Sequence, residues 1–237
     1  MGRHQVRQLL GAAALALAVS FPADAMAAGP VLKAEGASPV TAANPQGLVR
    51  VALTTSLGII VLELDTKHAP ITANNFLRYV DQKRLDGTGF YRAMKLGGGQ
   101  GLIQGGPSND PKRILKPIAH EPTNVTGLSH KAGAISMARW APGTATCDFS
   151  ILLSDMPSLD ANPSASGDNA GYAVFGRVVE GMDVVKKIYE APISATKGEG
   201  VMKGQMIEAP VKILTARRAK MPVAPPAAPP PGAAPSL

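Results

Sequence analysis

Apolar and polar positions alternate with a period of two near residue 48, where we predict that the folded part of the chain begins. Val49, Val51 and Leu53 alternate with polar or small residues, a pattern typical of a strand that is buried on one face. The mainly apolar run 57–64 predicts a second strand, and Thr55-Ser56 lies between the two. The folded part therefore opens with a predicted β-hairpin.

The hydrophobic period then changes to that of a helix. Apolar side chains recur three and four residues apart and would form one stripe on a helix surface: Ala73, Phe76, Leu77 and Val80. Pro70 suits the first turn, because no amide hydrogen is needed there, and we expect Thr72 to cap the start of the helix. We expect the helix to end near residues 85–87.

Short strands and loops rich in Gly, Pro, Asn and Ser make up the rest of the domain. Further strands are predicted in 89–94, 102–104, 134–138, 149–153, 172–178 and 206–216, and a second helix over 182–189. About eight strands with only two helices favour a closed antiparallel barrel whose open ends the helices cover. Periodicity alone leaves a sandwich of two sheets as the alternative.

The two ends of the chain differ from the middle in composition. Arg3 and Arg7 precede an apolar run over 9–19, which is shorter than the roughly 20 residues that a membrane-spanning helix needs. Small residues over 23–27 offer cleavage sites. We therefore predict a cleaved signal peptide in 1–27, with an uncleaved anchor as the alternative. A flexible leader over 28–47, a folded domain over 48–220 and a disordered Pro/Ala-rich tail over 221–237 complete the expected organisation.

Charge and cysteine content exclude several classes of function. The net charge is +7, but the Lys and Arg residues are scattered along the chain, so we do not expect binding to nucleic acid. Cys147 is the only cysteine, which excludes a disulfide framework and a thiolate metal site. The Gly-x-Ser-x-Gly motif of many hydrolases does not occur. We expect neither a metal ion nor another cofactor.

Five short motifs occur in a fixed order along the predicted domain. They are Ala69-Pro70-x-Thr72-x-x-Asn75-Phe76, Gly89-Phe90-Tyr91-Arg92, Ile103-Gln104-Gly105-Gly106, Gly133-Ala134-Ile135-Ser136-Met137-Ala138-Arg139, and the segment 171–183. Each motif is weak alone, but the ordered set resembles the cyclophilin family. The stretch Gly171-Tyr172-Ala173-Val174-Phe175-Gly176 is similar to the bacterial exported branch of that family.

The resemblance implies a fold, an activity and a location. It implies a mainly β, eight-stranded antiparallel closed barrel capped by two α-helices, with the site on the outer face. It implies a peptidyl-prolyl cis-trans isomerase without a cofactor, which acts on proline-containing peptides and unfolded exported proteins. We expect a monomer in the periplasm of a Gram-negative cell, with no stable membrane span after processing.

The resemblance also carries roles over to individual residues. Arg92 matches the catalytic arginine, and Gln104 matches the glutamine that binds the substrate backbone and supports that arginine. Of the expected substrate contacts, Leu102, Trp140 and Leu159 would surround the proline ring. The full set is Tyr91, Leu102, Ala138, Arg139, Trp140, Phe149, Leu159 and Tyr172. Phe149 is also expected to belong to the core.

Two positions depart from the family pattern in the proline pocket. Gly101 and Ser150 stand where the family has large phenylalanines. We expect Leu96, in the loop before Gly101, to supply part of the missing apolar surface. The departures leave a second hypothesis open, namely a peptide-binding chaperone or scaffold with a cyclophilin fold and weak catalysis.

Overall fold

The structure, a computed structural model, describes residues 47–220. The predicted signal peptide, the leader before residue 47 and the Pro/Ala-rich tail lie outside the described residues. No helix among residues 47–220 is both long enough and apolar enough to cross a membrane.

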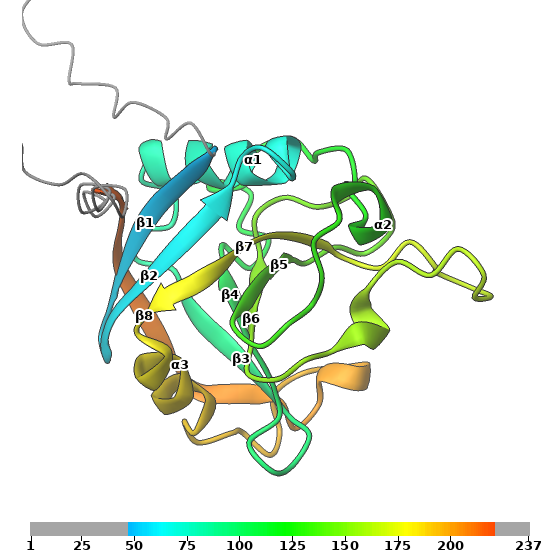
Figure 1. Cartoon of the computed structure of the whole chain (residues 1–237). Helices are drawn as coiled ribbons and strands as arrows, with labels where there is room; N and C mark the ends of the chain where they lie inside the picture. Colours follow the sequence, from blue (N-terminus) through cyan, green and yellow to red (C-terminus); the bar gives the residue numbers. More distant parts are fainter. Residues whose placement is uncertain (1–46, 221–237) are drawn as a thin grey trace, which may run out of the picture. The chain divides into compact units, whose positions relative to one another are not determined.

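Eight antiparallel strands form a closed barrel in the order β1-β2-β7-β5-β6-β4-β3-β8, and β8 pairs with β1 (Figure 1). The barrel that the strand count favoured is therefore confirmed, and a two-sheet sandwich is excluded. The strands are β1 (Leu48–Thr55), β2 (Gly58–Asp65), β3 (Gly89–Lys95), β4 (Gly101–Gly106), β5 (Ala134–Met137), β6 (Phe149–Leu152), β7 (Ala173–Glu180) and β8 (Met206–Ala219).

Two longer helices lie at opposite ends of the barrel, α1 (Pro70–Asp81) and α3 (Met182–Tyr189) (Figure 1). A single helical turn, α2 (Thr123–Thr126), and two short 3₁₀ turns at Pro157–Leu159 and Gly200–Met202 were not predicted. One turn of helix is too short to show a hydrophobic period, so the sequence pattern carries no signal for it.

The barrel is filled by aliphatic side chains around a small aromatic centre. Phe76 on α1 enters from one end, and its ring centroid lies 5.2 Å from that of Phe149 and 5.4 Å from that of Phe175. Phe90 meets Phe149 at 5.7 Å in an edge-on arrangement. All four rings are fully buried, and each contributes about 1.5–3 kcal/mol by leaving water. This core fixes α1 and the strands that carry the site.

Helix α1 begins and ends differently from the prediction. Thr72 is not its cap: the hydroxyl is buried and has no hydrogen-bond partner among the described residues. Instead, the Glu121 carboxylate accepts hydrogen bonds from the Ile71 and Thr72 amides at 2.9 and 2.6 Å, where the helix dipole favours a negative charge. The helix ends at Asp81 rather than at 85–87 because Lys83 adopts a left-handed φ of 55°.

Candidate active site

An irregularity in β3 places two neighbouring side chains on the outer face of the barrel. Phe90 pairs with Gly105 and Arg92 pairs with Gln104, so Tyr91 is an extra residue in the ladder. Successive side chains of a regular strand point to opposite faces, but this bulge breaks the alternation. Phe90 is buried, while Tyr91 and Arg92 both remain partly exposed.

The guanidinium of Arg92 is held by two glutamine side chains. Its Nη1 donates to Gln104 Oε1 at 2.7 Å, and its Nε and Nη2 donate to Gln205 Oε1 at 2.9 and 2.6 Å. No carboxylate within residues 47–220 forms an ion pair with it. Burial lowers the pKa of Arg92 from its ordinary value, yet a guanidinium stays protonated in proteins. The charge is therefore oriented but not neutralised.

A chain of polar contacts fixes the other end of Gln104. Its Nε2 donates to the Tyr91 hydroxyl oxygen at 3.0 Å, so its carbonyl oxygen faces Arg92. The Tyr91 hydroxyl also lies close enough to the Asp148 carboxylate to influence the pKa of that group. Asp148 also accepts a hydrogen bond from the Ser108 amide at 2.8 Å. Burial raises the pKa of both Asp148 and Tyr91.

A small group of apolar side chains lies next to Arg92, separate from the main core. Met94 links this group to Arg92, because its Sδ is 3.8 Å from Arg92 Nη2. The group, here the apolar cluster, consists of Leu102, Leu152 and Met156, with the partly exposed Met94 and Leu159 packed against them. An apolar surface beside a guanidinium is suited to hold a proline ring near a positive charge.

The structure corrects the interpretation of Gly101 as a vacated pocket floor. Its φ is +132°, and a Cβ atom there would lie 1.9 Å from the Met94 carbonyl oxygen. No side chain fits at this point of the chain, whatever the pocket requires. Leu96 does not replace the missing ring either, because it is 58% exposed and outside the apolar cluster. Met94 and Met156 supply apolar surface that the sequence analysis did not identify.

The second departure from the family pattern, Ser150, leaves a polar group beside Gln104. Ser150 faces Gln104 across the β4–β6 ladder and faces Ser136 across the β5–β6 ladder. Phe149, the next residue, points into the barrel and is fully buried. Phe149 can therefore support the site from inside but cannot touch a peptide, so its place among the substrate contacts is wrong.

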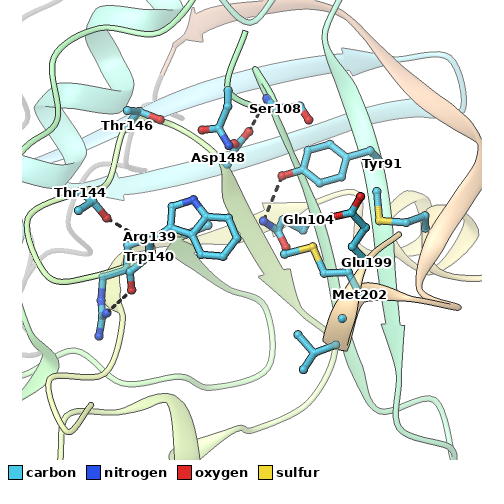
Figure 2. Close-up of a pocket in the computed structure, with 15 residues that line it drawn as sticks. Tyr91, Gln104, Ser108, Arg139, Trp140, Thr144, Thr146, Asp148, Glu199 and Met202 are labelled. Carbon is cyan, nitrogen blue, oxygen red and sulfur yellow. Dashed lines mark hydrogen bonds between the residues drawn. The ribbon is translucent and has the colours of Figure 1, made fainter. Parts of the chain in front are cut away.

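Gln104 also lines a cavity of about 510 Å³, whose lining includes no residue of the apolar cluster (Figure 2). Its lining includes the predicted contacts Tyr91, Ala138, Arg139 and Trp140, together with Asp148, which was not predicted. Trp140 was expected to surround the proline ring with Leu102 and Leu159. It lines this cavity instead, whereas the two leucines belong to the apolar cluster.

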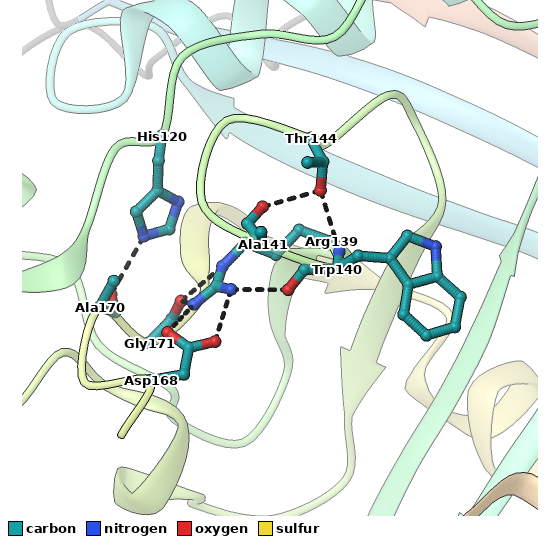
Figure 3. A network of polar contacts seen from close by, with 8 residues as sticks. All are labelled: His120, Arg139, Trp140, Ala141, Thr144, Asp168, Ala170 and Gly171. Carbon is teal, nitrogen blue, oxygen red and sulfur yellow. Dashed lines mark hydrogen bonds and ion pairs between the residues drawn. The ribbon is translucent and has the colours of Figure 1, made fainter. Parts of the chain in front are cut away.

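Arg139 has a structural task next to this cavity. Its guanidinium pairs with Asp168 at 2.7 Å and donates to the carbonyl oxygens of Gly171 and Trp140 (Figure 3). Its side chain is 1% exposed, so it cannot reach a peptide directly. Its Cζ lies 4.9 Å from the Tyr172 ring centroid. Arg139 thus braces the segment that carries Tyr172, whose amide donates to the Leu159 carbonyl at 3.0 Å.

The closed barrel, with a guanidinium and an apolar cluster on its outer face, defines a protein of the cyclophilin class. The sequence model of the cyclophilin-type peptidyl-prolyl cis-trans isomerases matches residues 50–218. The chain therefore belongs to this family of isomerases, as its motifs indicated.

Individual relatives agree with this assignment. The chain is 40% identical over 169 residues to a peptidyl-prolyl cis-trans isomerase of Acinetobacter baylyi, an alignment that covers 70% of this chain and 82% of the relative. It is 41% identical over 152 residues to one of Streptomyces antibioticus, covering 62% and 87% of the two chains. A crystal structure of a Cryptosporidium parvum cyclophilin superposes with a TM-score of 0.59 at 22% identity, covering 74% of this chain and 99% of that one, which supports the fold.

Proposed function

We propose that this isomerase acts on exported proteins and that Arg92 stabilises the twisted X-Pro amide during rotation. The single observation that carries the mechanism is the environment of the guanidinium. Two neutral amides orient it, no ion pair within residues 47–220 neutralises it, and an apolar cluster lies against it.

The chemistry requires no bond to be made or broken. Rotation about an X-Pro bond has a barrier of about 18–20 kcal/mol because it interrupts amide resonance. At the top of the barrier the prolyl nitrogen is pyramidal and carries a localised lone pair, which a cationic donor can stabilise. Each tenfold acceleration requires the transition state to be bound about 1.4 kcal/mol more tightly than the ground state.

The hydrogen bonds of Arg92 leave donors for this task. A guanidinium has five N–H groups, and three are used by Gln104 and Gln205. Of the remaining two, one belongs to Nη2 and donates to the weakly accepting Met94 sulfur at 3.8 Å. The other belongs to Nη1 and has no acceptor within residues 47–220. A proline ring on the apolar cluster would place its nitrogen near these two N–H groups.

The second hypothesis, a peptide-binding chaperone or scaffold with weak catalysis, rests on Ser150. A hydroxyl beside Gln104 replaces a large aromatic surface, and losing one such buried ring removes about 1.5–3 kcal/mol of apolar contact. A loosely held ring would bind but turn over slowly.

Export belongs to the same proposal. The positively charged start, the short apolar run and the small residues over 23–27 support a cleaved signal peptide and a periplasmic location. Clients would then be secreted or outer-membrane proteins that fold after export. Fractionation of cells that produce the full chain, with mass determination of the mature protein, tests this part.

The mechanism is tested with Arg92→Ala and Arg92→Lys in a refolding assay limited by proline isomerisation. We expect both variants to lose most of the rate enhancement while they keep the thermal transition of the parent, because a lysine cannot reproduce the planar donor set. Arg218→Ala, which removes an exposed arginine paired with Asp81 on another face, is the control. Unchanged rates for Arg92→Ala would refute the role of Arg92. Binding of unfolded chains by the parent without any acceleration would support the chaperone.

A further inference from the structure

The cavity beside Gln104 combines apolar walls with two carboxylates (Figure 2). Asp148 lies at its inner side, and Glu199 extends into it from the segment that precedes β8. Trp140 and Met202 contribute apolar side chains to its lining. Gln104 forms part of the wall, so the cavity adjoins the residues that hold Arg92.

The negative charge of the cavity is not compensated by the described part of the protein. Asp148 accepts a hydrogen bond from the Ser108 amide, and the nearby Tyr91 hydroxyl is neutral. Within residues 47–220, neither Asp148 nor Glu199 forms an ion pair. Among the described residues, Arg139 is the only Lys or Arg in the lining, and its guanidinium is bound to Asp168. An acidic cavity thus lies in a chain whose net charge is +7.

Trp140 offers an exposed but well-anchored aromatic surface to this cavity. Trp140 is 76% exposed, whereas its backbone is fixed on both sides (Figure 3). The Trp140 amide donates to Thr144 Oγ1 at 3.1 Å, and its carbonyl oxygen accepts from Arg139 Nη1 at 2.9 Å. A large exposed ring on a fixed backbone gains contact area at a low cost in conformational entropy.

We propose that the cavity is a specificity subsite that binds a lysine or arginine side chain of the substrate, near its proline. The inference rests on the proposed function, since it assumes that a peptide lies across Arg92 and Gln104. The aliphatic stem of the side chain would pack on Trp140 and Met202, as long basic side chains do on apolar surfaces. Its cation would meet Asp148 and Glu199 and the face of the indole.

Other side chains fit this lining less well. An apolar side chain would displace water from two carboxylates without giving them a partner, which costs free energy. An acidic side chain would meet like charges. A basic side chain satisfies both the apolar and the acidic parts of the wall.

The test uses a series of proline peptides. One position at a time, before or after the proline, is occupied by lysine, norleucine or glutamate. The measurement is kcat/KM for isomerisation by the parent, by Glu199→Gln and by Glu180→Gln. Norleucine keeps the stem and removes the charge. Glu180 is 64% exposed on another face, so its substitution changes the net charge equally without touching the cavity.

We expect lysine at one position to raise kcat/KM about fivefold over norleucine, which corresponds to about 1 kcal/mol, and glutamate to lower it. The lysine-to-norleucine ratio should fall towards one in Glu199→Gln and should stay unchanged in Glu180→Gln. Equal rates for lysine and norleucine at every position in the parent would overturn the subsite while leaving the isomerase intact. If the parent isomerises no peptide, the proposed function fails instead. Peptide affinities measured by calorimetry then decide the subsite: a lysine preference that Glu199→Gln removes supports it, and equal affinities overturn it.

Discussion

Gln205 Oε1 accepts two hydrogen bonds from the same guanidinium, at 2.9 Å from Arg92 Nε and at 2.6 Å from Arg92 Nη2. An aspartate or glutamate would make the same contact more strongly. It would also place a negative charge against the cation that the reaction needs. A neutral amide orients the guanidinium and leaves its charge available.

The substitution Gln205→Glu separates orientation from charge. It keeps the accepting oxygen, so we expect the thermal stability to be equal or higher. We expect kcat/KM to fall about tenfold or more, because the new carboxylate offsets at least about 1.4 kcal/mol of transition-state stabilisation. Refolding kinetics and a thermal melt on the same sample check both parts.

Gln82→Glu is the matched control for this variant. Gln82 Oε1 accepts from Arg84 Nε at 2.7 Å, an equivalent amide–guanidinium pair away from the site. The Gln82→Glu variant should change the net charge by the same amount as Gln205→Glu, without loss of activity. Full activity in Gln205→Glu would show that an ion pair with Arg92 is tolerated and that the reaction does not require a neutral partner.

Gly101 should resist every substitution because of its backbone. We expect Gly101→Ala to lower the free energy of unfolding by about 3 kcal/mol, since φ is +132° and the new Cβ would strike the Met94 carbonyl. Gly98→Ala is the comparison, because Gly98 also has a positive φ but no heavy atom within 4 Å of an added Cβ. It should cost about 1 kcal/mol. Chemical denaturation measures both, and equal losses would contradict the role of the close contact.

His130 should make stability depend on pH in the weakly acidic range. Its Nδ1 lies 2.6 Å from Asp160 Oδ1 and its Nε2 2.8 Å from Ser136 Oγ. Burial lowers its pKa from the ordinary 6.5, and this outweighs the attraction of Asp160. Well above pH 6.5 the ring is neutral in both states. As the pH falls through 6.5, the unfolded chain binds a proton that the folded chain does not, so the free energy of unfolding decreases until the lowered pKa is reached.

The measurement compares the parent with His130→Gln between pH 8 and pH 5. The advantage of the parent over the variant should shrink as the pH falls through this window, because an amide does not titrate. The titration of the other groups contributes equally to the free energies of unfolding of the two proteins and so cancels in their difference. A constant difference across the window would mean that His130 has the same pKa in the folded and unfolded chains.

The sequence predicts the barrel and the central pair of the site because both leave local signals. Strand periods and the ordered motifs identify the fold, and the motifs around Arg92 and Gln104 identify the pair. Gln205 lies in a stretch without a motif, and only the closure of β8 on β3 brings it to Arg92. Glu121 likewise reaches α1 from 49 residues away.

Gly101 shows why one comparison with the family pattern misled. An alignment treats a glycine in place of a phenylalanine as a lost side chain. The backbone at Gly101 has a conformation in which no side chain can be placed. Periodicity and motifs carry no information about φ, so only the three-dimensional structure reveals the role of Met94 beside Arg92.

The extra residue in β3 couples two parts of the outer surface, the apolar cluster beside Arg92 and the cavity lined by Tyr91. In a regular strand, outward side chains are two residues apart, roughly 6.6 Å, but here phenol and guanidinium stem from adjacent residues. One amide group can therefore touch both, with its oxygen on Arg92 and its nitrogen on Tyr91. A ligand that occupies both the apolar cluster and the cavity therefore affects the Gln104 amide through both of its hydrogen bonds. The affinities of its two parts are then not independent, and long peptides should bind with an energy that differs from the sum of their fragments.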